Sequence, residues 1–98
     1  MAIYNTLDRE RVAVNTAIGL TSAKVLAAGT IYARIQNVGD YTANYTTDGT
    51  TATALLGDLL YPGDIIEVWG TTDMSRFSII KNATASAIEV TYCGKEGA

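Results

Sequence analysis

Apolar and polar residues alternate along two segments of the chain, and this alternation predicts β-strands. In residues 30–37, the side chains of Ile31, Ala33 and Ile35 fall on one side of a pleated strand, because successive residues point to opposite faces. The same period of two returns in residues 86–93. Both segments are therefore expected to place one face against a core.

Turn residues divide the rest of the chain into further short strands. Glycine and aspartate recur at Val38–Asp40 and at Asp48–Gly49, and both favour turns. The Tyr61–Asp64 segment predicts a type II turn, because its proline presets φ and its glycine takes the left-handed position. A polar loop is expected over 70–73. The pattern predicts these strands, the second of them weak and the last two joined as a hairpin: 11–18, 20–26, 30–37, 41–47, 64–69, 76–81 and 86–93.

About seven short strands separated by turns indicate an all-β fold, a small antiparallel β-sandwich or barrel. We expect residues 11–98 to form a single β-sandwich domain. Residues 1–10 are expected to form an N-terminal arm, either irregular or one short helix capped by Thr6. The four leucines of residues 55–60 are expected to plug the core from an irregular crossing, because Gly57 disfavours a helix there.

The composition of the chain points to a covered surface. Charged residues make up 17% of its 98 residues, against about 25% in ordinary soluble domains. Few charges leave the edges of a sheet poorly defended against pairing with other strands. We expect neighbouring copies or a host surface to cover much of the protein, the alternative being that threonine hydroxyls hydrate its faces.

Charge and cysteine content narrow the classes of partner. The net charge is −3 and the seven basic residues are scattered, which disfavours nucleic-acid binding. No stretch approaches the roughly 20 apolar residues that cross a bilayer, so no membrane contact is expected. The N-terminus lacks the features of a signal peptide, which favours synthesis in the host cytoplasm. With no histidine and only Cys93, neither an internal disulfide nor a zinc site is expected.

Catalytic chemistry is not indicated by the residues present. Nucleophilic catalysis by serine or cysteine lacks a histidine base, and the Gly-x-Ser-x-Gly elbow does not occur. Five aspartates fall in predicted turns, where their side chains bond nearby backbone N–H groups. A small hydrolase with a carboxylate pair is a distant alternative. We expect no enzyme activity, no catalytic residues, no cofactor and no metal.

Aromatic and N-terminal apolar residues are the candidates for contact with a partner, because tryptophan and tyrosine are enriched at protein interfaces. Trp69 is expected to lie more in the core, and Tyr41 and Tyr45 more at an interface. The N-terminal arm is either a further contact or a disordered tail. The candidate partner-contact residues are Ile3, Tyr4, Leu7, Tyr41, Tyr45 and Trp69.

From about Val25 to Cys93, about two-thirds of the chain, the sequence resembles small accessory virion proteins of tailed bacteriophages, of the capsid decoration (cement) or head-fibre type. The resemblance rests on five elements: the stretch Ala-Arg-Ile-Gln-Asn-Val-Gly-Asp at 33–40, the Thr-Asp-Gly-Thr turn at 47–50, Leu-Leu-Tyr-Pro-Gly-Asp at 59–64, and the strands 77–81 and 87–92.

The resemblance implies a structural protein that binds the outside of a phage capsid and stabilises contacts between major capsid subunits. It implies the major capsid protein as partner, a homo-oligomer with a trimer favoured, and a location on the capsid surface of the virion. The alternative is a receptor- or glycan-binding module of a phage fibre or tail, which would use Tyr41, Tyr45 or Trp69 as stacking platforms.

Overall fold

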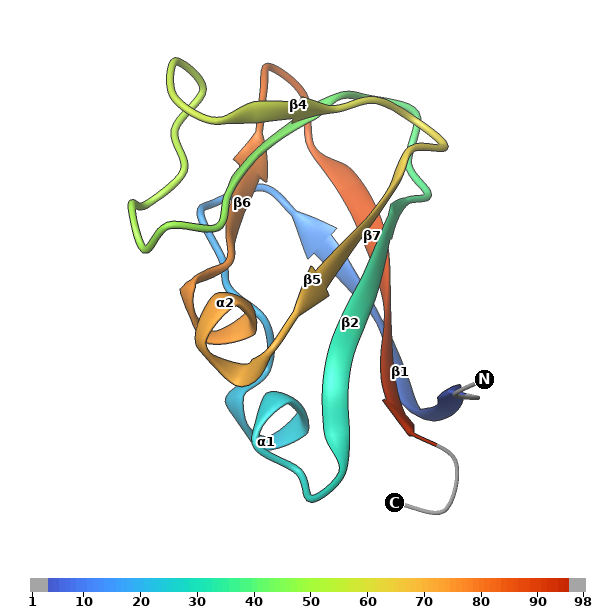
Figure 1. Ribbon diagram of the computed structural model, residues 1–98. Helices are drawn as coiled ribbons and strands as arrows, with labels where there is room; N and C mark the ends of the chain where they lie inside the picture. Colours follow the sequence, from blue (N-terminus) through green and yellow to red (C-terminus); the bar gives the residue numbers. More distant parts are fainter. Residues whose placement is uncertain (1–3, 96–98) are drawn as a thin grey trace.

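The computed structural model describes residues 4–95 and consists of two β-sheets with two short helices at one end (Figure 1). Strands account for 51% of the residues and helices for 11%, which confirms the all-β class. The elements are β1 (Tyr4–Val14), α1 (Ser22–Val25), β2 (Thr30–Asn37), β3 (Ala43–Thr46), β4 (Asp58–Leu60), β5 (Ile65–Trp69), α2 (Thr71–Arg76), β6 (Ser78–Lys81) and β7 (Ser86–Lys95).

Both sheets are antiparallel throughout. The first has four strands in the order β1-β7-β2-β5, and the second has three in the order β4-β3-β6. The two ladders remain separate, so the predicted small antiparallel fold is confirmed and closure as a barrel is not supported.

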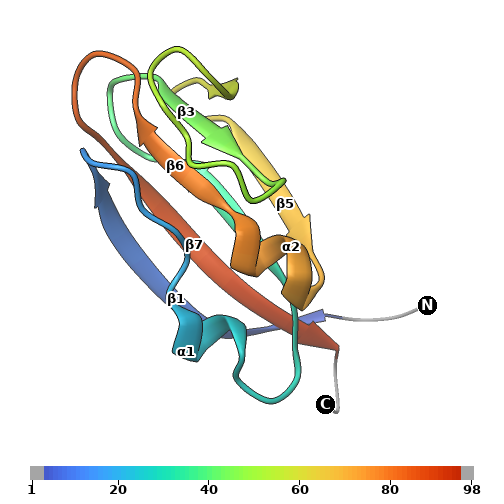
Figure 2. The same cartoon turned by 90° about the vertical axis from the view of Figure 1, so that its left-hand side faces the viewer.

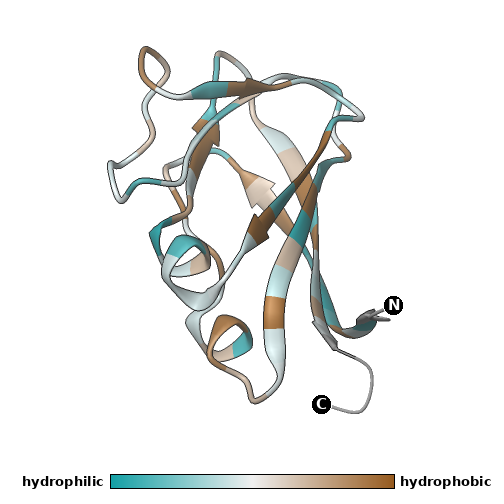
Figure 3. Cartoon of the chain, viewed as in Figure 1, coloured by the Kyte–Doolittle hydropathy of each residue, from teal (hydrophilic) through white to brown (hydrophobic). Residues whose placement is uncertain are grey.

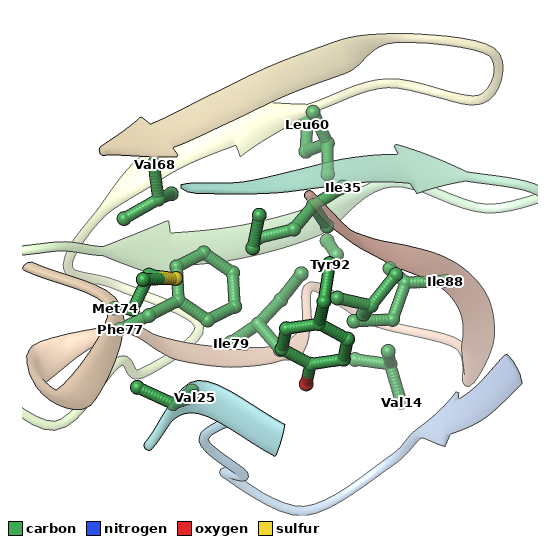
Figure 4. Close-up of a cluster of buried hydrophobic side chains, with 13 residues drawn as sticks. Val14, Val25, Ile35, Leu60, Val68, Met74, Phe77, Ile79, Ile88 and Tyr92 are labelled. Atoms are coloured by element: carbon green, nitrogen blue, oxygen red, sulfur yellow. The ribbon is translucent and has the colours of Figure 1, made fainter. Parts of the chain in front are cut away.

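The core lies between the two sheets, and Figure 4 shows its side chains pointing toward one another. From the four-stranded sheet come alternate residues of β2 and β7, including Ile35, Val90 and Tyr92, all fully buried. From the side of the three-stranded sheet, Ile79 of β6 and Phe77, which directly precedes β6, pack against these residues. The alternation read from the sequence in β2 and β7 is therefore confirmed.

The first strand begins much earlier than the sequence predicted. Strand β1 already starts at Tyr4, and residues 4–14 pair with β7 over its whole length, with one irregularity at Leu7. The described part of the expected 1–10 arm is thus part of the sheet, and the expected strand over 11–18 ends at Val14. The sequence pattern did not predict this part of the strand, because the charged residues at 8–11 interrupt the apolar alternation. Such charges are typical of a strand at the edge of a sheet.

Two short helices occupy segments where other structures were expected. Helix α1 replaces the weak strand predicted over 20–26, and α2 starts inside the predicted loop 70–73. Neither helix has a side-chain cap at its N-terminus. Each buries a single apolar residue, Val25 in α1 and Met74 in α2. Both helices are therefore stabilised by burial of an apolar side chain against the sheets, and not by local helix propensity.

The last two strands do not form the expected hairpin. Strand β6 pairs with β3, whereas β7 pairs with β1 and β2 in the other sheet. The chain between them crosses from one sheet to the other (Figure 2). Their proximity in the sequence predicted a hairpin. The two apolar strands instead pack against the core from opposite sides, one in each sheet.

Asn37 at the end of β2 holds three neighbouring segments together. It is fully buried, and its amide nitrogen donates to the carbonyl oxygens of Tyr41 (2.8 Å) and Leu60 (2.9 Å). Its side-chain oxygen accepts from the Gly39 N–H and the Ser86 hydroxyl. All the hydrogen-bonding capacity of this amide is used, which fixes the strand ends relative to one another.

The predicted turn between β4 and β5 is confirmed. The Asp64 N–H donates to the carbonyl oxygen of Tyr61 (2.9 Å), and Gly63 has φ of +87° as a type II turn requires. The Asp64 carboxylate in turn accepts the N–H of Tyr61 (3.0 Å). This turn passes the chain from the three-stranded sheet to the edge of the four-stranded one.

Candidate functional site

Large apolar side chains are exposed on residues 55–61, which we call the leucine loop. Leu55 is 99% exposed, and Leu56, Leu59 and Tyr61 are each about half exposed. In Figure 3 this segment, which includes β4, carries strongly hydrophobic residues at the end of the molecule opposite α1. The expectation that these leucines plug the core is wrong for all but Leu60, which is 1% exposed.

A polar cavity of about 330 Å³ lies beside the leucine loop. The carboxylate of Asp48, one of its lining residues, accepts the backbone N–H of Thr50 (2.9 Å). This hydrogen bond lowers the pKa of Asp48, and it supports the predicted turn at 48–49. The cavity is lined by Tyr45, Thr46, Thr47, Asp48, Thr50, Leu56, Gly57 and Asp58.

The outer face of the four-stranded sheet, the side away from the core, carries a stacked aromatic pair. The rings of Tyr32 on β2 and Trp69 on β5 lie 4.1 Å apart at an interplanar angle of 16°. Trp69 is 44% exposed, so the expectation that it lies in the core is wrong. A hydrogen bond with Cys93 and burial raise the pKa of Tyr32 to about 12.

Charges on this outer face are mixed. Arg34 of β2 lies directly across from Glu67 of β5 in the register of the sheet. Toward the opposite edge of the same face, the Arg11 guanidinium of β1 lies 3.6 Å from the Glu89 carboxylate of β7. Each of these two arginines therefore has an acidic neighbour on the outer face.

Tyr41 and Tyr45, both expected at an interface, differ in their surroundings. Tyr41 is 51% exposed in the turn after β2. Tyr45 instead packs against the core and stacks on Phe77, with ring centroids 6.1 Å apart. Burial raises the pKa of the Tyr45 hydroxyl. Tyr45 therefore contributes to the core, and its expected interface role stays a prediction.

The N-terminal candidates lie at the start of β1. Leu7 is 43% exposed at the irregularity of that strand. Tyr4 begins the strand, but its side chain is outside the described part of the structure, as is the whole of Ile3.

Leu7 also lines a cleft of about 450 Å³ between β1 and the helix α1. Across this cleft the Lys24 ammonium donates to the Asp8 carboxylate at 2.5 Å. The interaction lowers the pKa of Asp8 and raises that of Lys24. The cleft residues are Leu7, Asp8, Thr21, Ala23, Lys24, Ala27, Ala28 and Thr30.

A small polar network closes the inner end of the same region. The Tyr92 hydroxyl donates to Glu10 (3.0 Å) and accepts the backbone N–H of Thr21 (3.3 Å). The Thr21 hydroxyl donates to the other oxygen of Glu10 (2.8 Å). Burial and the Glu10 charge raise the pKa of Tyr92. This network ties the segment before α1 to β1 and β7, which is a structural role.

The described residues do not gather the groups that metal binding needs. Within residues 4–95, no cluster of three or more histidine, cysteine, aspartate or glutamate side chains is close enough to hold an ion. Cys93 is buried. No helix in this part of the chain is long and apolar enough to span a membrane.

Comparisons with known proteins found no match: no family model, no curated protein and no solved structure is significantly similar to this chain.

The sequence-predicted contact residues do not converge on one site. Trp69 lies on the outer face, Leu7 lines the α1 cleft and Tyr41 lies in a turn. Sequence reasoning missed the leucine loop as a surface. The available signal was the order Leu-Leu-Gly-Asp-Leu-Leu at 55–60, in which Gly57 and Asp58 interrupt the apolar run and mark a solvated segment.

Proposed function

We propose that this protein is a structural virion protein that binds the outside of a phage capsid and stabilises contacts between major capsid subunits. Its place is the capsid surface, and its binding chemistry is protein–protein contact, without catalysis, cofactor, nucleic acid or membrane. The protein acts as a homo-oligomer. Because it binds only the assembled shell, it shifts the equilibrium toward that shell by mass action.

The exposure of the leucine loop is the observation that carries this proposal. Monomeric soluble proteins rarely leave extended apolar patches in water, and such patches mark interaction sites. Leu55 is almost completely exposed, although leucine is among the residues most often buried in folded proteins. A capsid subunit that covered Leu55, Leu56 and Tyr61 would remove this apolar surface from water.

Co-sedimentation with capsids of the encoding phage tests the proposal. The wild-type protein is expected to pellet with the capsids at micromolar concentration. The double variant Leu55→Ser, Leu56→Ser is expected to bind at least about tenfold more weakly, because two exposed leucines lose their apolar contacts. Leu26→Ser is the matched control, since Leu26 is 67% exposed after α1 at the opposite end of the molecule.

Two results would count against capsid binding through this loop. If the wild-type protein stays in the supernatant at micromolar concentration, the proposed function fails. If Leu26→Ser weakens pelleting as much as the double variant, the leucine loop is not the contact.

Glycan binding is a second candidate because of the exposed Trp69. Indole rings are common stacking platforms for sugars, and Trp69 presents part of its surface on the outer face while stacking on Tyr32. A glycan array separates the two candidates. Binding to a defined glycan that is lost in Trp69→Ala but kept in the Leu55→Ser, Leu56→Ser variant would favour this second function.

A further inference from the structure

The two sheets present four edges, and they differ in how they are protected. Strand β4 is only three residues long. The edge of β6 is bridged by Ile18, which exchanges two backbone hydrogen bonds with Ile79 (3.0 and 2.9 Å). Strands β1 and β5 form the edges of the four-stranded sheet. These two strands are therefore where another strand has room to pair.

The charges of strand β1 oppose its pairing with β1 of a second copy. Its outer face carries Arg9 and Arg11 and its inner face Asp8 and Glu10. A two-fold pair of β1 strands would align like faces and bring like charges together. The Asp8 carboxylate also accepts the backbone N–H of Arg9 (2.8 Å), which occupies a donor on this edge.

Strand β5 lacks these devices. Asn37 donates to the Asp64 carbonyl and Gly70 donates to the Ile31 carbonyl, so even-numbered residues face β2. By the alternation of an antiparallel ladder, the backbone N–H and C=O groups of Ile65 and Glu67 point away from β2. Both side chains are exposed, and Glu67 is the only charged residue of the strand. An open row of backbone donors and acceptors is matched by another extended strand.

We propose that β5 pairs with β5 of a second copy about a two-fold axis, joining two four-stranded sheets into one of eight strands. This assigns a surface to the oligomer in the proposed function, and it does not depend on what the oligomer binds. The axis passes beside Ile66, so that Ile65 of each copy exchanges two backbone hydrogen bonds with Glu67 of the other.

Self-complementarity favours a second copy as the occupant. Ile66 lies across from Ile35 in the sheet and packs only partly against the core. With the axis at Ile66, the inner face carries an unbroken row of Ile35, Ile66 and the same two residues of the second copy. Such β-branched pairs stabilise neighbouring strands. This register also places Glu67 opposite Ile65 of the second copy, and not opposite another carboxylate.

Sedimentation velocity between about 10 µM and 1 mM measures the association, which is expected to be weak because a short strand buries less than the roughly 1,600 Å² of a standard interface. The mass should approach two subunits at high concentration, which also distinguishes this pair from a trimer. Glu67→Pro removes an outward donor without touching the bonds to β2, and should raise the dimer dissociation constant at least about tenfold. Arg9→Pro makes the matched change on the β1 edge and should leave the dimer intact.

Disulfide trapping tests the register independently of proline. In a Cys93→Ser background, Ile66→Cys should form a covalent dimer under an added oxidant, because directly opposed residues of this pair type have close Cα atoms. Gln36→Cys, one strand away from the axis, should not form a covalent dimer.

A monomer at 1 mM without trapping overturns the inference, as does a dimer that Glu67→Pro leaves unchanged. A wild-type protein that stays monomeric yet needs β5 to pellet with capsids would assign the edge to the capsid subunit instead. Dimer formation without capsid pelleting would refute only the proposed function.

Discussion

At the scale of single residues, the buried amide of Asn37 is expected to contribute strongly to stability. Its buried amide makes four hydrogen bonds to groups near the strand ends. Asn37→Ala is expected to lower the free energy of unfolding by about 3 kcal/mol, because it leaves buried carbonyls without their donor. Urea denaturation followed by circular dichroism measures the change. Asn15→Ala, at an exposed position, is the control; an equal loss there would contradict the role of Asn37.

Two tyrosines also make the protein sensitive to alkaline pH. The folded-state pKa values of Tyr32 and Tyr92 are raised, that of Tyr32 to about 12, against about 10 in an unfolded chain. Above about pH 10 the unfolded state therefore loses protons that the folded state keeps, and stability falls as pH rises. Below about pH 10 these two groups do not change the free energy of unfolding with pH.

Denaturation midpoints between pH 8 and 12 test this expectation, together with the absorbance of ionised phenol. Tyr92→Phe should show a shallower decline above pH 10, because one of the two shifted groups is gone. A wild-type protein whose stability is flat up to about pH 12 would show that both hydroxyls ionise as in the unfolded chain.

At the scale of elements, the sequence predicted those whose pattern reflects burial on one face. Strands β2 and β7 and the turn at 61–64 have the expected positions, because alternation and the Pro-Gly pair report local geometry. Helices α1 and α2 were not predictable, since each depends on one buried residue and has no capping side chain. The pairing of β6 with β3 was equally hidden, because strand partners are chosen by long-range packing. The exposed leucines of the candidate site were missed because their apolar run was interpreted as part of the core, although Gly57 and Asp58 interrupt it.

The charges of β1 provide a prediction at this scale. If Arg9 guards the edge of the sheet, Arg9→Thr should increase self-association at low ionic strength, because the strand becomes easier to pair. Light scattering at increasing concentration measures the effect. Arg34→Thr removes the same charge from the same outer face but on the central strand β2. Equal scattering by the two variants would mean that net charge, and not the edge position, controls association.

At the scale of the whole molecule, apolar residues are divided between a core and a surface. The chain has few charges, yet its buried cluster leaves Leu55, Leu56 and Leu59 outside. A small domain gains stability from every apolar side chain that it buries. Leaving three leucines of one short segment in water therefore forgoes stability, which is understandable if another protein covers them.

Two leucines five positions apart test this division directly. Leu60→Ala removes a side chain that is 1% exposed and should lower the free energy of unfolding by about 2–5 kcal/mol, through lost burial and a residual cavity. Leu55→Ala removes the same atoms from a position that is 99% exposed and should change it by less than about 0.5 kcal/mol. Urea denaturation of both variants gives the comparison. If Leu55→Ala proved as destabilising as Leu60→Ala, Leu55 would contribute to the fold, and the leucine loop would lose its claim to be a surface kept for a partner.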